Sequence, residues 1–220
     1  MKLQISKSVT AKALVGGLAA LALSGSANAA LTVFSGFDPG ASAIGALSGA
    51  AAGAFDVAVG AHNTITFENA VPAGVAISRG SITNTFGCAP ALCGFNTTSG
   101  GAFALSVFGG LVTFTFTAPI SSFGAYFTGV QITANNMSFN DGAAHTIAIP
   151  GTLATGGISF VGFTDFGKSI SSITIDMNND IVAVDDIRYL AAAVPEPETY
   201  ALMLAGLAAM GTVARRRKSV

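Results

Sequence analysis

The strongest constraint on this sequence is a two-residue alternation of apolar and polar side chains. In the stretch GLVTFTFTAP, residues 110–119, Val112, Phe114 and Phe116 alternate with threonines. Alternate side chains of a β-strand point to opposite faces, so this stretch predicts a strand with one face in a core. Similar alternation recurs in several other segments: 63–69, 121–129, 129–139, 145–151, 156–165, 171–180 and 180–190.

The spacing of these segments predicts the fold class. They follow one another at intervals of about 8–15 residues and are separated by Gly, Pro, Asn and Asp, as in an antiparallel β-sandwich or barrel. No helical pattern alternates with them, which disfavours a parallel α/β sheet. The Ala/Gly-rich stretch 41–55 is compatible with one weak helix, because each of its interior glycines costs about 1 kcal/mol relative to alanine.

The first 29 residues have the three parts of a secretory signal peptide. Three lysines precede the apolar stretch 13–23, and small residues with an Ala27-Asn28-Ala29 site follow. The apolar part is too short to cross a hydrocarbon core of about 30 Å. The pattern predicts cleavage between Ala29 and Ala30, which leaves a β-sandwich domain over residues 30–193.

Residues 194–220 form a second characteristic end. The triplet Pro195-Glu196-Pro197 is followed by an uncharged apolar run, residues 199–214, and then by Arg215, Arg216, Arg217 and Lys218. A helix over 199–214 would be about 24 Å long, at the lower limit for a transmembrane helix. Basic residues next to such a helix stay in the cytoplasm. The residues alone predict an exported chain with a C-terminal membrane anchor.

The order of these three parts resembles the PEP-CTERM sorting signal. In that family exosortase, a membrane-embedded cysteine protease, processes the tail in Gram-negative bacteria that make exopolysaccharide. The resemblance implies processing by signal peptidase and exosortase, a transient anchor in the inner membrane, and a final place at the cell surface or outside the cell. It covers only the C-terminal end and implies no activity for the domain before it.

The charge of the domain is more acidic than that of the whole chain. Seven of the ten basic residues lie in the two ends, which leaves three cations against nine acids in residues 30–193, a formal charge of −6. Such a balance argues against binding to a nucleic-acid phosphate backbone. Acidic, Gly/Ser/Thr-rich surfaces suit secreted proteins that meet sugars or divalent cations.

Cys88 and Cys93 are the only cysteines. Outside the cytoplasm, two cysteines this close are most simply a disulfide. A redox motif is disfavoured because it needs C-x-x-C at the start of a helix. A metal site at the thiols is disfavoured because only His62 and His145 are available to join them.

A second resemblance concerns the domain itself. The stretches TITFENAVPAG and FVGFTDFGKSISSITIDMNNDIVAVDDIRY look like jelly-roll ectodomains of the galactose-binding-like type found in PEP-CTERM proteins. The resemblance implies an all-β, antiparallel jelly-roll-like sandwich. In related sugar-binding jelly rolls, carboxylates of the first and last strands hold a structural Ca²⁺, which points here to Glu68, Asp185 and Asp186.

Asp185 draws attention independently of that resemblance. By period two it shares a strand face with Ala183, Ile187 and Tyr189, so its side chain is expected to point toward the core. A buried carboxylate must be paired, protonated or bound to a cation, and Ca²⁺ suits oxygen ligands. The alternative is that Asp185 accepts hydrogen bonds from backbone N–H groups at a strand end.

The remaining motifs are weak as indicators of chemistry. Asn140-Asp141-Gly142 predicts a hairpin turn, and neither G-x-S-x-G nor a phosphate-binding glycine loop is present. The sequence therefore predicts a non-enzymatic surface or matrix protein associated with exopolysaccharide or biofilm. The alternatives are a carbohydrate-binding module with a defined glycan and, more remotely, a glycan-active hydrolase.

Overall fold

The computed structural model describes residues 30–84, 87–193 and 197–217. Its helices and strands, in chain order, are β1 (Thr32–Pro39), α1 (Ala46–Val59), β2 (Asn63–Ile65), β3 (Val75–Ile77), β4 (Ser81–Thr83), α2 (Pro90–Cys93), β5 (Ala104–Phe108), β6 (Leu111–Thr128), β7 (Asn136–Asn140), β8 (Ala144–Ala148), β9 (Gly157–Thr164), β10 (Ile170–Asp176), β11 (Ile181–Ala191) and α3 (Pro197–Arg217).

The described strands form one antiparallel sheet. The long strand β6 belongs to both of its two facing parts, because its partners change along its length. This strand is 18 residues long and contains Pro119. Its first part, residues 111–116, pairs with β3 and β10, and β7 and β8 extend that side. Its second part, residues 122–128, pairs with β9 and β11. Proline lacks an N–H to donate to a ladder, which fits its place where the neighbours change.

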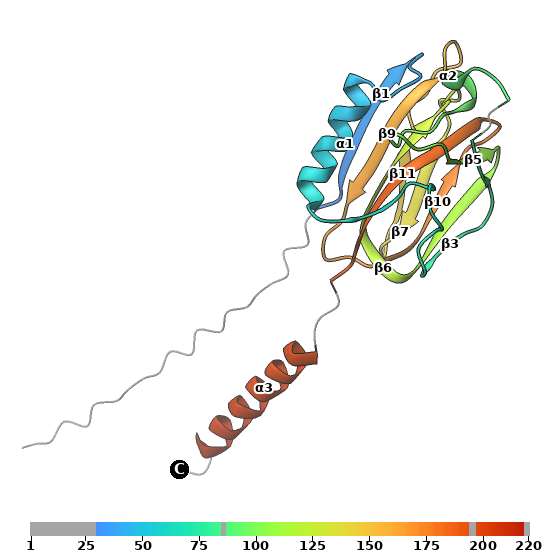
Figure 1. The fold of residues 1–220 in the computed structure, drawn as a ribbon. Helices are drawn as coiled ribbons and strands as arrows, with labels where there is room; N and C mark the ends of the chain where they lie inside the picture. Colours follow the sequence, from blue (N-terminus) through green and yellow to red (C-terminus); the bar gives the residue numbers. More distant parts are fainter. Residues whose placement is uncertain (1–29, 85–86, 194–196, 218–220) are drawn as a thin grey trace, which may run out of the picture.

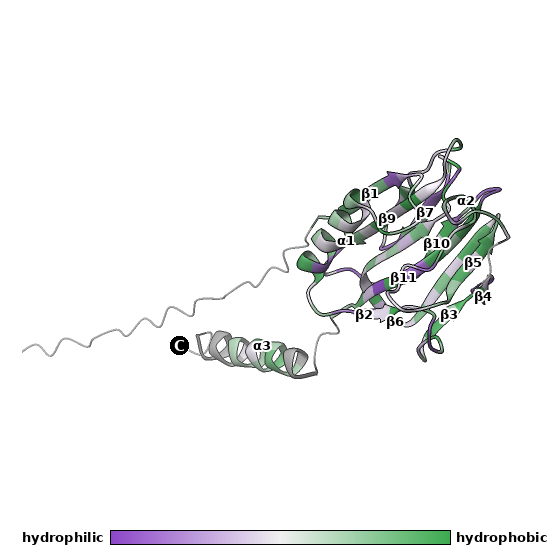
Figure 2. Cartoon of the chain, turned by 45° about the horizontal axis from the view of Figure 1, so that its top comes forward, coloured by the Kyte–Doolittle hydropathy of each residue, from purple (hydrophilic) through white to green (hydrophobic). Residues whose placement is uncertain are grey.

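The two parts of the sheet pack face to face. Phe114 contacts Phe123 across the fold of β6, with ring centroids 5.9 Å apart. Phe139 of β7 stacks on Phe163 of β9 at 3.9 Å. These rings belong to one core cluster to which both parts contribute, and burial of each large side chain contributes about 1.5–3 kcal/mol. Many hydrophilic residues lie instead at strand ends and in loops (Figure 2).

Helix α1 covers the outer face of the sheet beside β1 and β9 (Figure 1). Phe55 of α1 is fully buried there, against Phe160. It fits because Gly124 and Gly162 are paired across β6 and β9: a Cβ at Gly162 would lie 2.9 Å from the Phe55 ring. Strand β9 is therefore buried on both faces, which explains its nearly continuous apolar sequence.

The coarse fold prediction is confirmed, since the chain is mostly β with an antiparallel sheet. Val112, Phe114 and Phe116 are buried as the alternation predicts. An all-β description is incomplete because α1 forms a third layer; the helix begins at Ala46 and ends at Val59, later at both ends than the 41–55 stretch. The carboxylate of Asp38 accepts hydrogen bonds from the N–H groups of its first turn.

The C-terminal tail contains a helix where the sequence predicts one, and α3 includes Arg215, Arg216 and Arg217. Within the described residues, no helix is both long and apolar enough to cross a membrane. The uncharged run 199–214 is 16 residues, whereas a spanning helix takes about 20. The predicted signal peptide 1–29, with the Ala29 side of its cleavage site, and Pro195, Glu196 and Lys218 lie outside the described residues.

Candidate functional site

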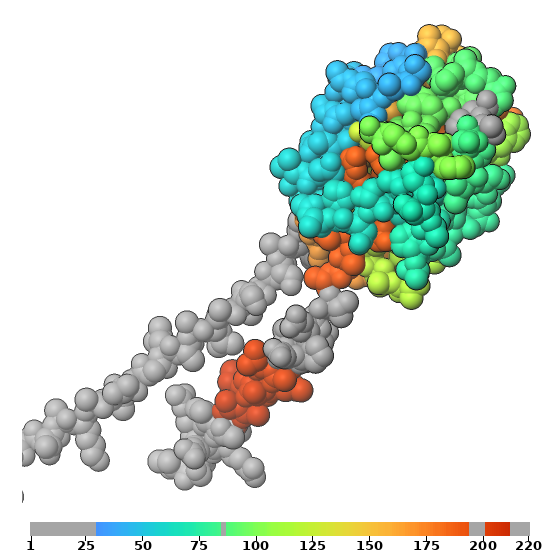
Figure 3. Space-filling model, viewed as in Figure 1, coloured from blue at the N-terminus to red at the C-terminus, as the bar shows by residue number. Residues whose placement is uncertain are grey.

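The predicted metal ligands Glu68, Asp185 and Asp186 all bind one segment, residues 95–103, which connects α2 with β5 and is called here the 95–103 loop. We refer to these three carboxylates as the loop clamp. In the space-filling view, green atoms of the region that includes this loop and teal atoms of the segment after α1 lie over β11, coloured orange (Figure 3).

Asp185 points into the protein, as its place in the alternation predicts, and its side chain is 0% exposed. Its Oδ2 atom accepts hydrogen bonds from the N–H of Thr97 (2.7 Å), the hydroxyl of Thr97 (2.9 Å) and the N–H of Thr98 (3.3 Å). Its Oδ1 atom is buried with no hydrogen-bond partner. Burial raises the pKa of Asp185 to about 6, although the Thr97 hydrogen bonds oppose the rise.

Glu68 holds the other half of the 95–103 loop. Its Oε1 atom accepts hydrogen bonds from the N–H groups of Ala102 (2.8 Å) and Phe103 (2.7 Å) and from the side-chain amide of Asn96. The bonds from Ala102 and Phe103 hold the pKa of Glu68 below its usual range. The preceding residue, Phe67, is buried with a φ of 60°, a conformation uncommon for residues other than glycine.

Asp186 lies at a bulge, where the register between β11 and β6 shifts and its own φ is 48°. Its Oδ1 atom accepts a hydrogen bond from the Thr98 hydroxyl (3.1 Å), and its Oδ2 atom lies 3.8 Å from the Arg188 guanidinium. The loop clamp is not a group of three converging metal ligands by the spacing of its oxygens. Calcium binding at Glu68, Asp185 and Asp186 stays a prediction, and the predicted alternative role of Asp185 as an acceptor for backbone N–H groups is observed.

Cys88 and Cys93 form the predicted disulfide, with their Cα atoms 5.6 Å apart. The bond closes the short turn that contains α2, and Cys93 is buried. The 95–103 loop begins two residues later, where the N–H of Phe95 donates a hydrogen bond to the Thr128 hydroxyl (2.7 Å). The disulfide therefore fixes the point at which the chain enters the loop.

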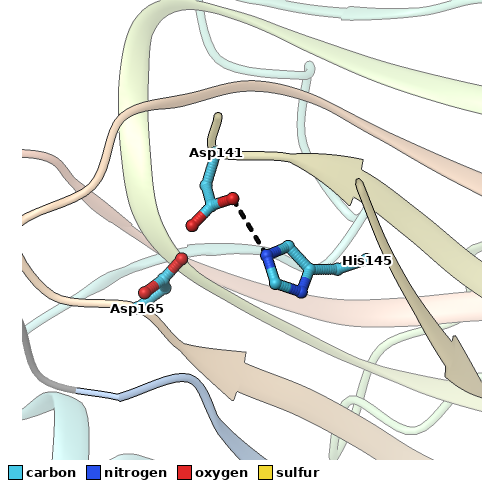
Figure 4. Close-up of side chains that lie close together, drawn as sticks. All are labelled: Asp141, His145 and Asp165. Carbon is cyan, nitrogen blue, oxygen red and sulfur yellow. Dashed lines mark hydrogen bonds and ion pairs between the residues drawn. The ribbon is translucent and has the colours of Figure 1, made fainter. Parts of the chain in front are cut away.

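A different group of side chains has the spacing of metal ligands. One oxygen each of Asp141 and Asp165 and one ring nitrogen of His145 all lie within 4.8 Å of one another (Figure 4). We call these three residues the rim cluster. Asp141 lies in the β7–β8 turn, His145 on β8, and Asp165 directly after β9. The Nε2 atom of His145 lies 2.9 Å from Oδ1 of Asp141.

The rim cluster continues the inward rows of the core. Asp141 follows Phe139 by two residues, and Asp165 follows Phe163 by two residues. Because Phe139 and Phe163 stack between the two parts of the sheet, the next inward positions bring the two carboxylates together at the rim. His145 is paired with Phe139 in the β7–β8 register, and the two rings stack at 4.9 Å.

The charges in the rim cluster are unevenly compensated. Asp141 accepts a hydrogen bond from the N–H of Ala143, the main cause that holds its pKa below the usual range. Asp165 is 3% exposed, its Oδ2 atom has no hydrogen-bond partner, and burial together with the nearby Asp141 raises its pKa. The nearest lysine, Lys168, is 36% exposed, and its Nζ atom lies 3.4 Å from Oδ2 of Asp141.

The rim cluster is missed when Asn140-Asp141-Gly142 is interpreted only as a turn. That turn is present, with the Gly142 N–H bound to the Asn140 side chain, but its aspartate also faces Asp165. A signal exists in the sequence: Phe-x-Asp occurs twice, at 139–141 and 163–165, each time at a strand end. The sequence does not show that the two strands face each other.

Comparison with known proteins adds information on the tail. Residues 193–218 match the model of the PEP-CTERM protein-sorting motif. No curated protein and no solved structure gives a significant match to the chain. The motif indicates an exported protein that exosortase processes, with a sorting step at a membrane, in agreement with the prediction from Pro195, Glu196, Pro197 and the arginines.

Proposed function

We propose that the chain is a non-enzymatic structural or adhesive protein, sorted to the cell surface or extracellular matrix and associated with exopolysaccharide. The observation that carries this proposal is the sorting motif at residues 193–218, directly after β11, which ends at Ala191. In this proposal, signal peptidase removes residues 1–29 in a Gram-negative bacterium. The tail then anchors the folded domain in the inner membrane until exosortase acts.

The sorting step is tested by replacing Pro195-Glu196-Pro197 with three alanines and fractionating the cells. The variant is expected to keep its tail and accumulate with the inner membrane, whereas the parent chain reaches the surface with a lower mass. Thr199→Ala, two residues after the triplet, is the matched control and should be processed normally. An unchanged mass and location of the triplet variant would leave an ordinary anchor in place of a sorting signal.

The matrix role is tested with the released protein. It is expected to co-sediment with exopolysaccharide isolated from the same cells and to release no reducing sugar from it. Protein that stays in the supernatant would remove the exopolysaccharide association. Release of sugar would instead support the remote alternative, a glycan-active hydrolase.

A specific groove favours the second candidate, a carbohydrate-binding module. Tyr189 is partly exposed and contacts Phe116, with ring centroids 5.2 Å apart and the rings tilted by 46°, in a groove that Asn63 and Thr117 also line. An aromatic ring beside amide and hydroxyl groups suits the apolar face and the hydroxyls of a sugar. A glycan array would distinguish the two candidates: defined hits that Tyr189→Ala abolishes favour the module, and their absence favours the structural role.

A further inference from the structure

The rim cluster brings two carboxylates together with too little positive charge around them. Asp165 is almost completely buried, its Oδ2 atom lacks a partner, and Asp141 faces it (Figure 4). An isolated buried carboxylate is costly unless a proton or a cation compensates it. Lys168 reaches only Asp141 among the ion pairs of the described residues. A cation between Asp141, Asp165 and His145 would compensate both carboxylates, and the ligand atoms of these residues lie within 4.8 Å of one another.

The ligand types decide which cation fits. Calcium and magnesium take oxygen ligands, and calcium takes six to eight of them. An imidazole nitrogen beside two carboxylates suits zinc and related transition metals, which bind with three protein ligands and one water. We propose that the rim cluster binds one divalent transition-metal ion of the zinc type, through carboxylate oxygens of Asp141 and Asp165 and the imidazole of His145.

The surroundings of His145 are suited to a ligand. Its ring is held against Phe139 by stacking at 4.9 Å, so its orientation is set by the core. Its Nε2 atom already faces Oδ1 of Asp141 at 2.9 Å, and a metal would take the place of the proton between these two atoms. His62, the other histidine, has one carboxylate near it, that of Asp56, 3.6 Å from its Nε2 atom.

Binding at the rim cluster would join the two parts of the sheet. Asp141 and His145 belong to the β7–β8 hairpin, on the side of β10, whereas Asp165 directly follows β9, which pairs with β1 and the second part of β6. A metal would thus link the layers above the stacked Phe139 and Phe163. Lys168 would keep its contact with an oxygen of Asp141 that is not bound to the metal, or turn into solvent.

The test uses the untagged full-length chain in detergent, stripped of metals with a chelator. Zinc chloride is titrated by calorimetry, calcium chloride is titrated in parallel, and cobalt(II) serves as a spectroscopic probe of the ligand geometry. Asp165→Asn keeps the shape of the side chain, and His145→Phe keeps the stacked ring. His62→Phe is the matched control, because it removes the other histidine while keeping an aromatic ring.

One zinc ion per chain is expected, with binding stronger than that of calcium, and with visible cobalt(II) bands typical of a low coordination number. Asp165→Asn and His145→Phe should each weaken zinc binding about tenfold or more, and His62→Phe should leave it unchanged. Lys168→Ala should leave binding intact or strengthen it. The proposal is overturned by an absence of zinc binding, by binding insensitive to both ligand substitutions, by a preference for calcium, or by weaker binding in Lys168→Ala. Circular dichroism of each variant checks its fold, and Asp165→Asn alone remains decisive if His145→Phe does not fold.

Discussion

The loop clamp and the rim cluster are both built from acidic residues near strand ends, yet their oxygens meet opposite surroundings. Asp185 is surrounded by N–H and O–H donors of Thr97 and Thr98. Each of these two acids has one buried oxygen without a hydrogen-bond partner, but Asp165 faces a second carboxylate where Asp185 faces donors. Hydrogen-bond donors from a loop allow a buried carboxylate to hold that loop in place. A neighbouring carboxylate instead adds negative charge that a cation would compensate. The role of a buried acid is therefore indicated less by the number of acids in its region than by the groups that its oxygens face.

The largest effect is expected where the loop clamp loses an acceptor. Asp185→Ala leaves three donors of Thr97 and Thr98 without an acceptor. The free energy of unfolding should therefore fall by about 3 kcal/mol. Chemical denaturation at pH 5 with chelator measures the change. Asp176→Ala, which removes a single Asx-turn bond to Asn178, is the control and should lose under about 1 kcal/mol. Equal losses would show that the loop contributes little to stability.

Removing the disulfide tests how far the loop clamp depends on the covalent bond just before the 95–103 loop. A Cys88→Ser, Cys93→Ser double variant should lose about 2 kcal/mol, since the closed segment is short. Combined with Asp185→Ala, the loss should be less than additive, because both changes release the same loop. Denaturation midpoints of the separate and combined variants give the coupling. Strict additivity would mean that the disulfide and Asp185 hold independent structures.

The pH dependence of stability gives a further test of the loop clamp. The folded-state pKa of Asp185 is about 6, above its unfolded value of about 3.9. The folded state thus binds the proton more tightly, and stability rises as pH falls from 7 through 6 toward 4. Between pH 7 and pH 5 the gain should be about 1 kcal/mol relative to Asp185→Asn, measured with chelator present. A difference between the two proteins that does not change with pH would contradict the raised pKa of the buried Asp185 carboxylate.

The smallest effect is expected at the rim cluster without metal. Asp165→Asn removes a charge that faces Asp141 and an oxygen that has no partner, so stability should stay equal or rise by under about 1 kcal/mol. Thermal unfolding with chelator gives the shift of Tm, and the same substitution should become unfavourable with zinc. A loss of several kcal/mol with chelator would place Asp165 in a role like that of Asp185.

The sequence predicts positions along a strand better than neighbours across space. Period two correctly places Val112, Phe114, Phe116 and Asp185 inward. What Asp185 meets there depends on a loop some 88 residues away in sequence, and local pattern carries no information on that contact. The meeting of Asp141 with Asp165 likewise depends on how the sheet turns through β6.

Helix α1 also shows that local sequence does not predict contacts between distant segments. The composition of 41–55 indicates a weak helix because of its glycines, and its stability comes from tertiary packing that composition does not contain. Phe55 is buried against a surface made by Gly124 and Gly162, which in the sequence are unremarkable strand glycines. The disulfide could be predicted because its two cysteines are five residues apart and leave no other pairing.

The long strand β6 also determines when this protein can fold during export. Its partners run from β3, which begins at Val75, to β11, which ends at Ala191. The edge of β6 that pairs with β11 is not complete until this last strand is available, and β11 ends only two residues before the sorting motif begins at residue 193. Such non-local pairing makes folding slow relative to chains rich in local contacts. If the tail is held at the membrane as proposed, the chain would stay at the site of the sorting step while β11 inserts, and retention would coincide in time with completion of the fold.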